Sequence, residues 1–141
     1  WRNWLGGSRD MHVVHSKDGI QFSKAEKLGS GTWVLNACPM DGGDLGFDAS
    51  GAVWSAFRRE NNVILAAPTA KESDLGKGKD PALAIGRKGP YVAWSDGGIQ
   101  LHKPGESLVL DPAGAFVHLV AGDHVYAAWE SGKQIRIARV D

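Results

Sequence analysis

A short aromatic pattern that recurs three times is the feature that most constrains this chain of 141 residues. The pattern is aromatic-x-Ala-aromatic, and it occurs at Trp54–Phe57, Tyr91–Trp94 and Tyr126–Trp129. The final aromatic residues of successive copies are 37 and then 35 residues apart. A turn-forming stretch and a second β-rich run follow each copy. The repeat therefore predicts an all-β protein built from several similar sheets.

A short apolar run also precedes each copy of the aromatic pattern. These runs are Leu45–Phe47, Ala82–Ile85 and Phe116–Val120. Because successive side chains of a strand point to opposite faces, Trp54 and Ala56 face one way and Phe57 the other. Both faces are apolar or small, which favours the stacked, four-stranded antiparallel blades of a β-propeller. A β-sandwich, in which one face of each sheet is more often solvated, is the alternative.

The length of the chain allows roughly three blades plus partial blades, since a blade takes about 40–50 residues. Trp1 is read as a fourth copy of the last aromatic residue, so the first unit lacks its first strand and most of its second. The last unit, which ends at Asp141, lacks a fourth strand. We expect residues 1–141 to be part of a single propeller domain, the C-terminal half of a longer one. Its open blade edges would favour self-association.

Charge and composition exclude several classes of function. Sixteen Lys and Arg residues balance sixteen Asp and Glu residues, which argues against nucleic-acid binding driven by bulk charge. No apolar run approaches the about 18 residues of a transmembrane helix. The Gly29–Gly31 segment lacks the third glycine of a dinucleotide-binding loop, so no nucleotide cofactor is expected. His12 and His15 fall on opposite faces of a strand, so no metal site is expected. Cys38, the single cysteine, is expected to be a free, packed thiol.

A turn motif follows the apolar run at residues 11–14. It spans Ser16–Phe22, reads Ser-Lys-Asp-Gly-Ile-Gln-Phe, and resembles a shortened Asp box of the sialidase-like (bacterial neuraminidase repeat) propellers. In such a turn Ser16 and Asp18 form hydrogen bonds across the bend. Gly19 permits a positive φ angle, and Phe22 is expected to fill the core.

Most of residues 1–67 is also similar to sialidase-like proteins, at segments 2–3, 8–11, 38–43 and 54–60. The resemblance implies a six-bladed propeller, an exo-glycosidase ancestry and a secreted or periplasmic location. In that family the turns between the second and third strands, and the links between blades, lie on the ligand face. The Asp box lies on the opposite face, so we expect its role here to be structural.

Four arginines fall on two adjacent loops of the expected ligand face: Arg2 and Arg9 on one, Arg58 and Arg59 on the other. Guanidinium groups bind carboxylates in a bidentate way. Sialidases hold the carboxylate of their sugar with three arginines, so the resemblance implies a carbohydrate or other small acidic ligand. These four arginines are the predicted ligand-binding residues.

The first candidates for acid–base catalysis are Asp10, Asp41 and Glu60. Asp10 and Glu60 lie on the two arginine loops, and Asp41 lies on the link between blades at residues 38–44 of the same expected face. Sialidases use a Tyr/Glu pair as nucleophile. The only tyrosines here, Tyr91 and Tyr126, occupy the repeated aromatic position and are expected to be structural.

Structural interpretations of these charged residues stay open beside the functional ones. Arg58–Glu60 fits a solvated charge cluster, Arg9 and Asp10 fit an internal ion pair, and Asp41 fits a turn former. The sequence therefore supports two hypotheses. One is a sialidase-like propeller that binds or cleaves an acidic glycan, and the other is a non-catalytic binding or scaffold module.

Overall fold

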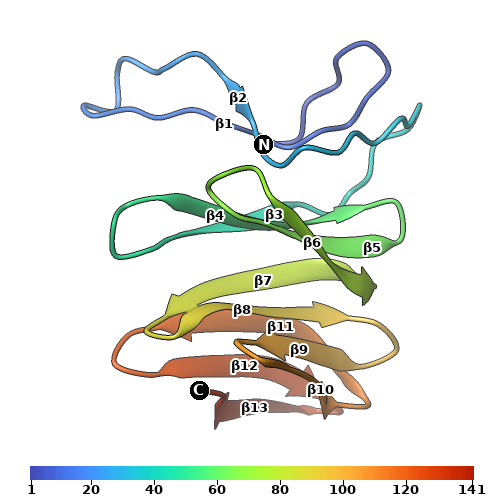
Figure 1. Ribbon diagram of the computed structural model, residues 1–141. Coiled ribbons are helices and arrows are strands. Elements are labelled where there is room, and N and C mark those ends of the chain that lie inside the picture. The colour runs from blue at the N-terminus through green and yellow to red at the C-terminus, as the bar shows by residue number, and fades with distance from the viewer.

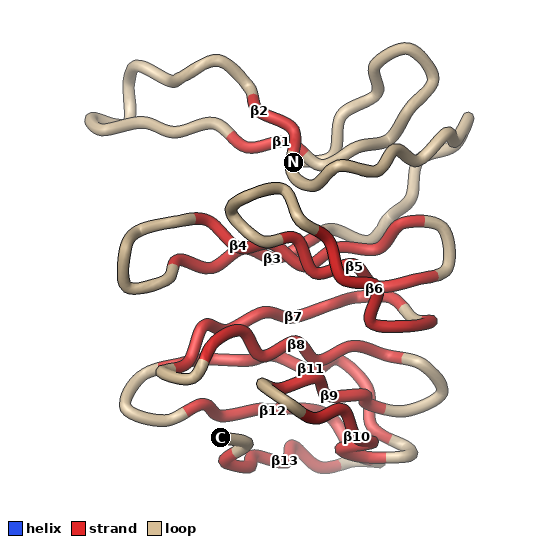
Figure 2. The backbone as a smooth tube through the Cα atoms, viewed as in Figure 1, coloured by secondary structure: helices blue, strands red, loops and turns tan.

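The computed structural model describes residues 1–141 and consists of strands and loops (Figure 1; Figure 2). Thirteen strands form four sheets, and all strand pairs are antiparallel. The prediction of an all-β protein is confirmed. No helix in the structure is long and apolar enough to cross a membrane.

Each sheet is built from strands that are consecutive in the sequence. The first sheet pairs β1 (His12–Val13) with β2 (Glu26–Lys27). The second contains β3 (Gly43–Phe47), β4 (Val53–Arg59), β5 (Asn62–Ala66) and β6 (Glu72–Lys77). The third contains β7 (Lys79–Gly86), β8 (Gly89–Ser95), β9 (Ile99–Lys103) and β10 (Glu106–Asp111). The fourth contains β11 (Gly114–Ala121), β12 (Val125–Ser131) and β13 (Gln134–Arg139).

The sheets are stacked in chain order, and three apolar clusters join them (Figure 1). The cluster between the first and second sheets contains Met11, Phe57, Ile64 and Ala66. The cluster between the second and third sheets contains Ala56, Val63, Leu65, Leu83, Val92 and Trp94. The cluster between the third and fourth sheets includes Ala84, Tyr91, Ala93, Ile99, Leu101, Val117, Val125, Ala127 and Trp129. Strands β4 and β8 are therefore buried on both faces, as their aromatic pattern predicts.

The last aromatic residue of each repeat faces the preceding sheet. Phe57, Trp94 and Trp129 each lie in the cluster on that side. The two indoles also donate hydrogen bonds to the end of the preceding sheet, Trp94 to the carbonyl of Lys77 at 2.7 Å and Trp129 to Asp111 at 2.8 Å. The repeated aromatic residue thus contributes apolar burial, about 1.5–3 kcal/mol for a fully buried side chain, and anchors the link between sheets.

Tyr91 and Tyr126 occupy the same position in successive repeats but differ in burial. Tyr91 is 2% exposed, as predicted for a structural residue, whereas Tyr126 is 41% exposed. The prediction that Tyr126 is a core residue is wrong, because its face of the fourth sheet is not covered by another sheet. Exposed apolar side chains share that face, among them Val120, Ile135 and Ile137.

The loops fall on two opposite sides of the stack (Figure 1). The loop of residues 2–10 and the β4–β5, β8–β9 and β12–β13 turns lie on the right of that view. We call this side the hairpin face. The Ser16–Phe22 turn lies on the left, so the structure places it opposite the hairpin face, as expected.

The Ser16–Phe22 turn has the expected hydrogen bonds. Oδ1 of Asp18 accepts hydrogen bonds from the amides of Ile20 and Gln21 at 2.8 Å, and Oγ of Ser16 accepts one from Gly19 at 2.8 Å. The φ angle of Gly19 is 73°. The expectation that Phe22 fills the core is wrong, because its side chain is 61% exposed and no cluster covers it.

Candidate anion-binding site

Arg2 joins two loops of the hairpin face. Its Nη1 donates to the carbonyl of Arg9 at 2.8 Å, and its Nη2 donates to the carbonyl of Arg58 at 2.9 Å. One guanidinium therefore ties together two residues that are 49 positions apart. Arg2 thus links three of the four predicted arginines through their backbones, and we call these residues the arginine cluster (Arg2, Arg9 and Arg58).

Tryptophan side chains pack against the arginine cluster. The guanidinium carbons of Arg2 and Arg58 lie 5.0 and 5.4 Å from the centre of the Trp33 ring, and Trp33 is buried. The guanidinium of Arg9 lies 5.5 Å from the ring of Trp4, which is exposed. Such cation–π contacts orient the guanidinium groups. Sequence reasoning missed Trp33, because it lies in a stretch without strand periodicity and outside the aromatic repeat.

Asp41 forms a two-point ion pair with Arg58. Oδ1 of Asp41 lies 2.9 Å from Nη2 of Arg58, and Oδ2 lies 2.7 Å from Nε. The side chain of Asp41 is 4% exposed and that of Arg58 is 24% exposed. Arg58 is thus part of a shielded ion pair rather than a solvated charge cluster, and Asp41 is more than a turn former. The carboxylate fixes the direction of the Arg58 guanidinium.

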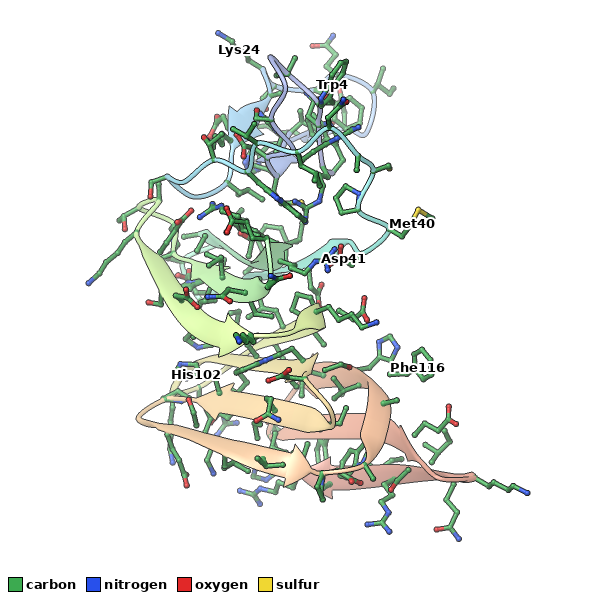
Figure 3. The ribbon with its side chains drawn as sticks, turned by 90° about the vertical axis from the view of Figure 1, so that its right-hand side faces the viewer. Trp4, Lys24, Met40, Asp41, His102 and Phe116 are labelled. Atoms are coloured by element: carbon green, nitrogen blue, oxygen red, sulfur yellow. The ribbon has the colours of Figure 1, made fainter.

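The loop that carries Asp41 runs over the surface before β3 begins. Figure 3 shows Met40 projecting away from the molecule next to Asp41, and Met40 is 92% exposed. Cys38 is also exposed, so the prediction of a packed thiol is wrong. The physical reason is that this part of the loop belongs to no strand and carries no apolar pattern that would bury it.

Arg59 lies outside the arginine cluster. Its Nη1 and Nη2 donate to the two carboxylate oxygens of Glu72 at 2.8 and 2.7 Å, and Nη2 also donates to the carbonyl of Gly31 at 3.1 Å. The hydrogen bond to Glu72 raises the pKa of Arg59 and lowers the pKa of Glu72 to about 2. Since adjacent residues of β4 point to opposite faces, Arg58 and Arg59 serve different neighbours. The donors of Arg59 are used within the fold.

The arginine cluster has more donors than the protein satisfies. Neither Nη atom of Arg9, nor Nη1 of Arg58, donates to a protein acceptor, and these atoms reach the surface. The Nε atoms of Arg2 and Arg9 are buried without an acceptor. Burial lowers the pKa of Arg2, Asp41 raises it in part, and Arg58 lowers it further. The guanidinium groups of Arg2 and Arg58 therefore share the carboxylate of Asp41, and the unused donors of Arg9 and Arg58 favour an anion.

The carboxylates proposed for catalysis have different surroundings. Asp10 is buried, accepts a hydrogen bond from the amide of Trp33 at 2.9 Å and pairs with Lys27 at 2.9 Å. Burial raises the pKa of Asp10, but the Trp33 amide and the Lys27 ammonium together outweigh this effect and hold the pKa below its ordinary value. Its ion-pair partner is thus Lys27 and not Arg9. Glu60 lies exposed in the β4–β5 turn with a φ angle of 55°.

Comparisons of the chain with protein families, with curated proteins and with solved structures found no match. We therefore infer its function from the geometry of the arginine cluster and its surroundings.

Proposed function

We propose that the chain is part of a sialidase-like β-propeller and binds the carboxylate of an acidic sugar at the arginine cluster. The observation that carries this proposal is the pair of unused guanidinium ends of Arg9 and Arg58, whose backbones are tied together by Arg2. A carboxylate is the flat, two-oxygen anion that such guanidinium groups bind best.

Three features of the fold support the propeller part of the proposal. Each full sheet is a four-stranded antiparallel meander, successive sheets stack through both faces, and the repeated aromatic residue has the same orientation in each. Meandering sheets that repeat at this spacing are typical of propeller blades. The arginine cluster lies on the hairpin face, where the family resemblance implies the ligand.

The residues of the cluster have distinct roles in this proposal. Arg9 and Arg58 contact the ligand carboxylate, Arg2 positions both of them, and Asp41 orients the Arg58 guanidinium. The exposed ring of Trp4 beside Arg9 forms an apolar wall for the sugar. Arg59 belongs to the fold through Glu72 and is not part of the ligand site.

We infer a binding module rather than a hydrolase from the state of the carboxylates. Glycosidases need a carboxylic acid that can give up a proton and a second carboxylate beside it. Asp10 is held ionised between Trp33 and Lys27, and Asp41 is held by Arg58. No hydrogen bond joins a tyrosine to the arginine cluster, so the Tyr/Glu pair of sialidases has no counterpart among these residues.

A fluorescence titration tests the proposal, because Trp4 and Trp33 contact the arginines that would bind the ligand. We expect N-acetylneuraminic acid or glucuronic acid to change the tryptophan emission with saturation, and the methyl ester of the same sugar to leave it unchanged. Arg9→Gln removes a charge-assisted contact worth about 1.5–3 kcal/mol, which corresponds to a roughly 10- to 150-fold weaker affinity.

Arg87→Gln is the matched control for Arg9→Gln. Arg87 is 77% exposed and pairs with Asp123 at 2.9 Å, away from the cluster, so its replacement should leave the affinity unchanged. The proposal would be contradicted if the protein bound the acid and its methyl ester equally. An equal loss of affinity in Arg9→Gln and Arg87→Gln would also contradict it. Hydrolysis of a fluorogenic sialoside that is lost in Arg9→Gln would identify the site as catalytic and would contradict the inference of a binding module.

A further inference from the structure

The exposed face of the fourth sheet corresponds, residue by residue, to a buried face of the third sheet. In the fourth sheet Ala128 pairs with Ile137, as Ala93 pairs with Leu101 in the third. Leu101 is 1% exposed because the fourth sheet covers it, whereas Ile137, which no sheet covers, is 71% exposed. The same correspondence joins Tyr126 to Tyr91 and Ile135 to Ile99.

The second sheet follows the same rule. Its equivalent pair, Ala56 and Leu65, lies in the cluster that the third sheet covers. Both sheets that have a successor in the stack therefore bury this face. An antiparallel sheet that turns one face to water usually carries polar side chains on it, so the exposed face of the fourth sheet has the sequence of a covered one.

Five large apolar side chains make up this exposed face, which we call the terminal face: Phe116, Val120, Tyr126, Ile135 and Ile137. Phe116 joins the face through a bulge in β11, where the pairing register shifts and its φ angle is 54°. Phe116 and Ile135 line one hollow of about 280 Å³. Covering the five side chains would remove roughly 400 Å² of apolar surface from water, and patches of this size often mark interaction surfaces.

We infer that the terminal face binds the terminal face of a second copy of this chain, so that two stacks join end to end through their fourth sheets. Figure 1 shows the fourth sheet at one end of the stack and the first sheet at the other. The first sheet consists of two strands of two residues each, so it offers no flat surface of comparable size. The terminal face matches itself in area, and a two-fold contact of a face with itself forms a closed dimer.

The area of the terminal face agrees with a dimer of moderate affinity. Roughly 400 Å² of apolar surface per copy, with the polar side chains at the rim, gives a total of about 1,000–1,200 Å² for the contact. This total is near the lower limit of specific interfaces, so we expect a dissociation constant in the micromolar range. The two sheets would pack about 10 Å apart with nearly aligned strands, as stacked sheets do.

Charged residues at the two ends of the terminal face fit the same arrangement. Glu130 pairs with Ile135 at one end of the β12–β13 hairpin, and Arg139 pairs with Tyr126 at the other. Glu130 forms no ion pair within the chain, and Arg139 uses its Nε for Asp141 and keeps its Nη atoms free. A two-fold axis that runs across the strands reverses their direction. It therefore brings Glu130 of one copy near Arg139 of the other, which favours this orientation.

Analytical ultracentrifugation of the full chain tests this inference. Between about 1 and 500 µM the wild type should pass from monomer to dimer. Ile137→Glu places an unpaired charge in the contact and should weaken association at least about 100-fold. Val120→Glu, on β11 of the same face, should have the same effect. Val120 is 64% exposed and Ile137 71%, so urea denaturation at low concentration should show both variants folded.

Ile20→Glu is the matched control, since Ile20 is also an exposed isoleucine but lies in the Ser16–Phe22 turn beside the first sheet. This variant should dimerise as the wild type does. A wild type that stays monomeric at about 500 µM, or an Ile137→Glu variant that still dimerises, would refute the contact.

A mixing experiment tests the two-fold symmetry of the contact. Because both chains must supply the terminal face, fluorescently labelled Ile137→Glu should stay monomeric in an excess of unlabelled wild type. Recruitment of the labelled variant, or growth of the wild type into assemblies larger than a dimer, would show that the terminal face binds a different surface of the second copy and would overturn the inference. The proposed ligand site plays no part in these measurements, so their failure leaves the proposed function standing.

Discussion

Replacing Glu72 by glutamine tests whether Arg59 serves the fold rather than the ligand. The carboxylate of Glu72 accepts two hydrogen bonds from Arg59, at 2.7 and 2.8 Å. Its Oε1 also accepts hydrogen bonds from the amides of Ser30 at 2.8 Å and Gly31 at 3.1 Å. Glu72 therefore joins β6 of the second sheet to the loop that follows the first sheet.

The expected loss of stability follows from the pKa of Glu72. The hydrogen bond and charge of Arg59, together with the amides of Gly31 and Ser30, lower that pKa from an ordinary value of 4.5 to about 2. One pKa unit corresponds to about 1.4 kcal/mol, so the ionised side chain stabilises the fold by about 3 kcal/mol at neutral pH. Both side chains of the pair are 16% exposed, so solvent screens the interaction little. Since glutamine keeps some of the hydrogen bonds, we expect Glu72→Gln to lose about 2–3 kcal/mol.

The loss should depend on pH in a defined direction. Because the pKa of Glu72 is lower in the folded state, its contribution is complete above about pH 4.5 and disappears as the pH falls towards 2. Urea denaturation should show a difference between wild type and Glu72→Gln of about 2–3 kcal/mol at pH 7, shrinking to about 1 kcal/mol at pH 3. A difference that is absent at pH 7, or equal at both pH values, would refute this reasoning.

Two matched pairs of substitutions test the packing between sheets. Gly78→Ala should destabilise the fold by about 2 kcal/mol or more in thermal unfolding, because at a φ angle of 143° its Cβ would overlap the indole of Trp94. Gly97→Ala, at a φ angle of 67° with open space around it, should cost only about 1 kcal/mol. Tyr91→Ala should cost about 3–5 kcal/mol in urea denaturation, whereas Tyr126→Ala on the uncovered face should cost less than about 1 kcal/mol. Equal losses within either pair would contradict the packing described.

The strands and their stacking could be predicted because both depend on local patterns. Alternation of side chains within β4 and β8 placed residues such as Ala56 and Phe57 on opposite faces, and both faces are buried. The same rule places Arg58 and Arg59 on opposite faces, so their separate roles were within reach of the sequence. The predicted burial of Tyr126 was wrong, because the burial of a strand residue depends on whether a neighbouring sheet covers its face.

The rest of the site depends on contacts between loops distant in the sequence. Glu72 accepts a hydrogen bond from Gly31, which lies 41 residues earlier in the sequence. Neither residue belongs to a periodic sequence pattern that would predict this contact. The bulge at Phe116 carries no turn signal, since the residue with positive φ is not glycine. Neither feature leaves a trace in composition or spacing, so only the three-dimensional structure shows them.

A crystal structure of the protein with N-acetylneuraminic acid tests the central claim most directly. We expect the carboxylate of the sugar within hydrogen-bonding distance of the free Nη atoms of Arg9 and Arg58, with the Arg59–Glu72 pair unchanged. A carboxylate bound to Arg59, or a sugar seated on the Ser16–Phe22 turn, would contradict the account.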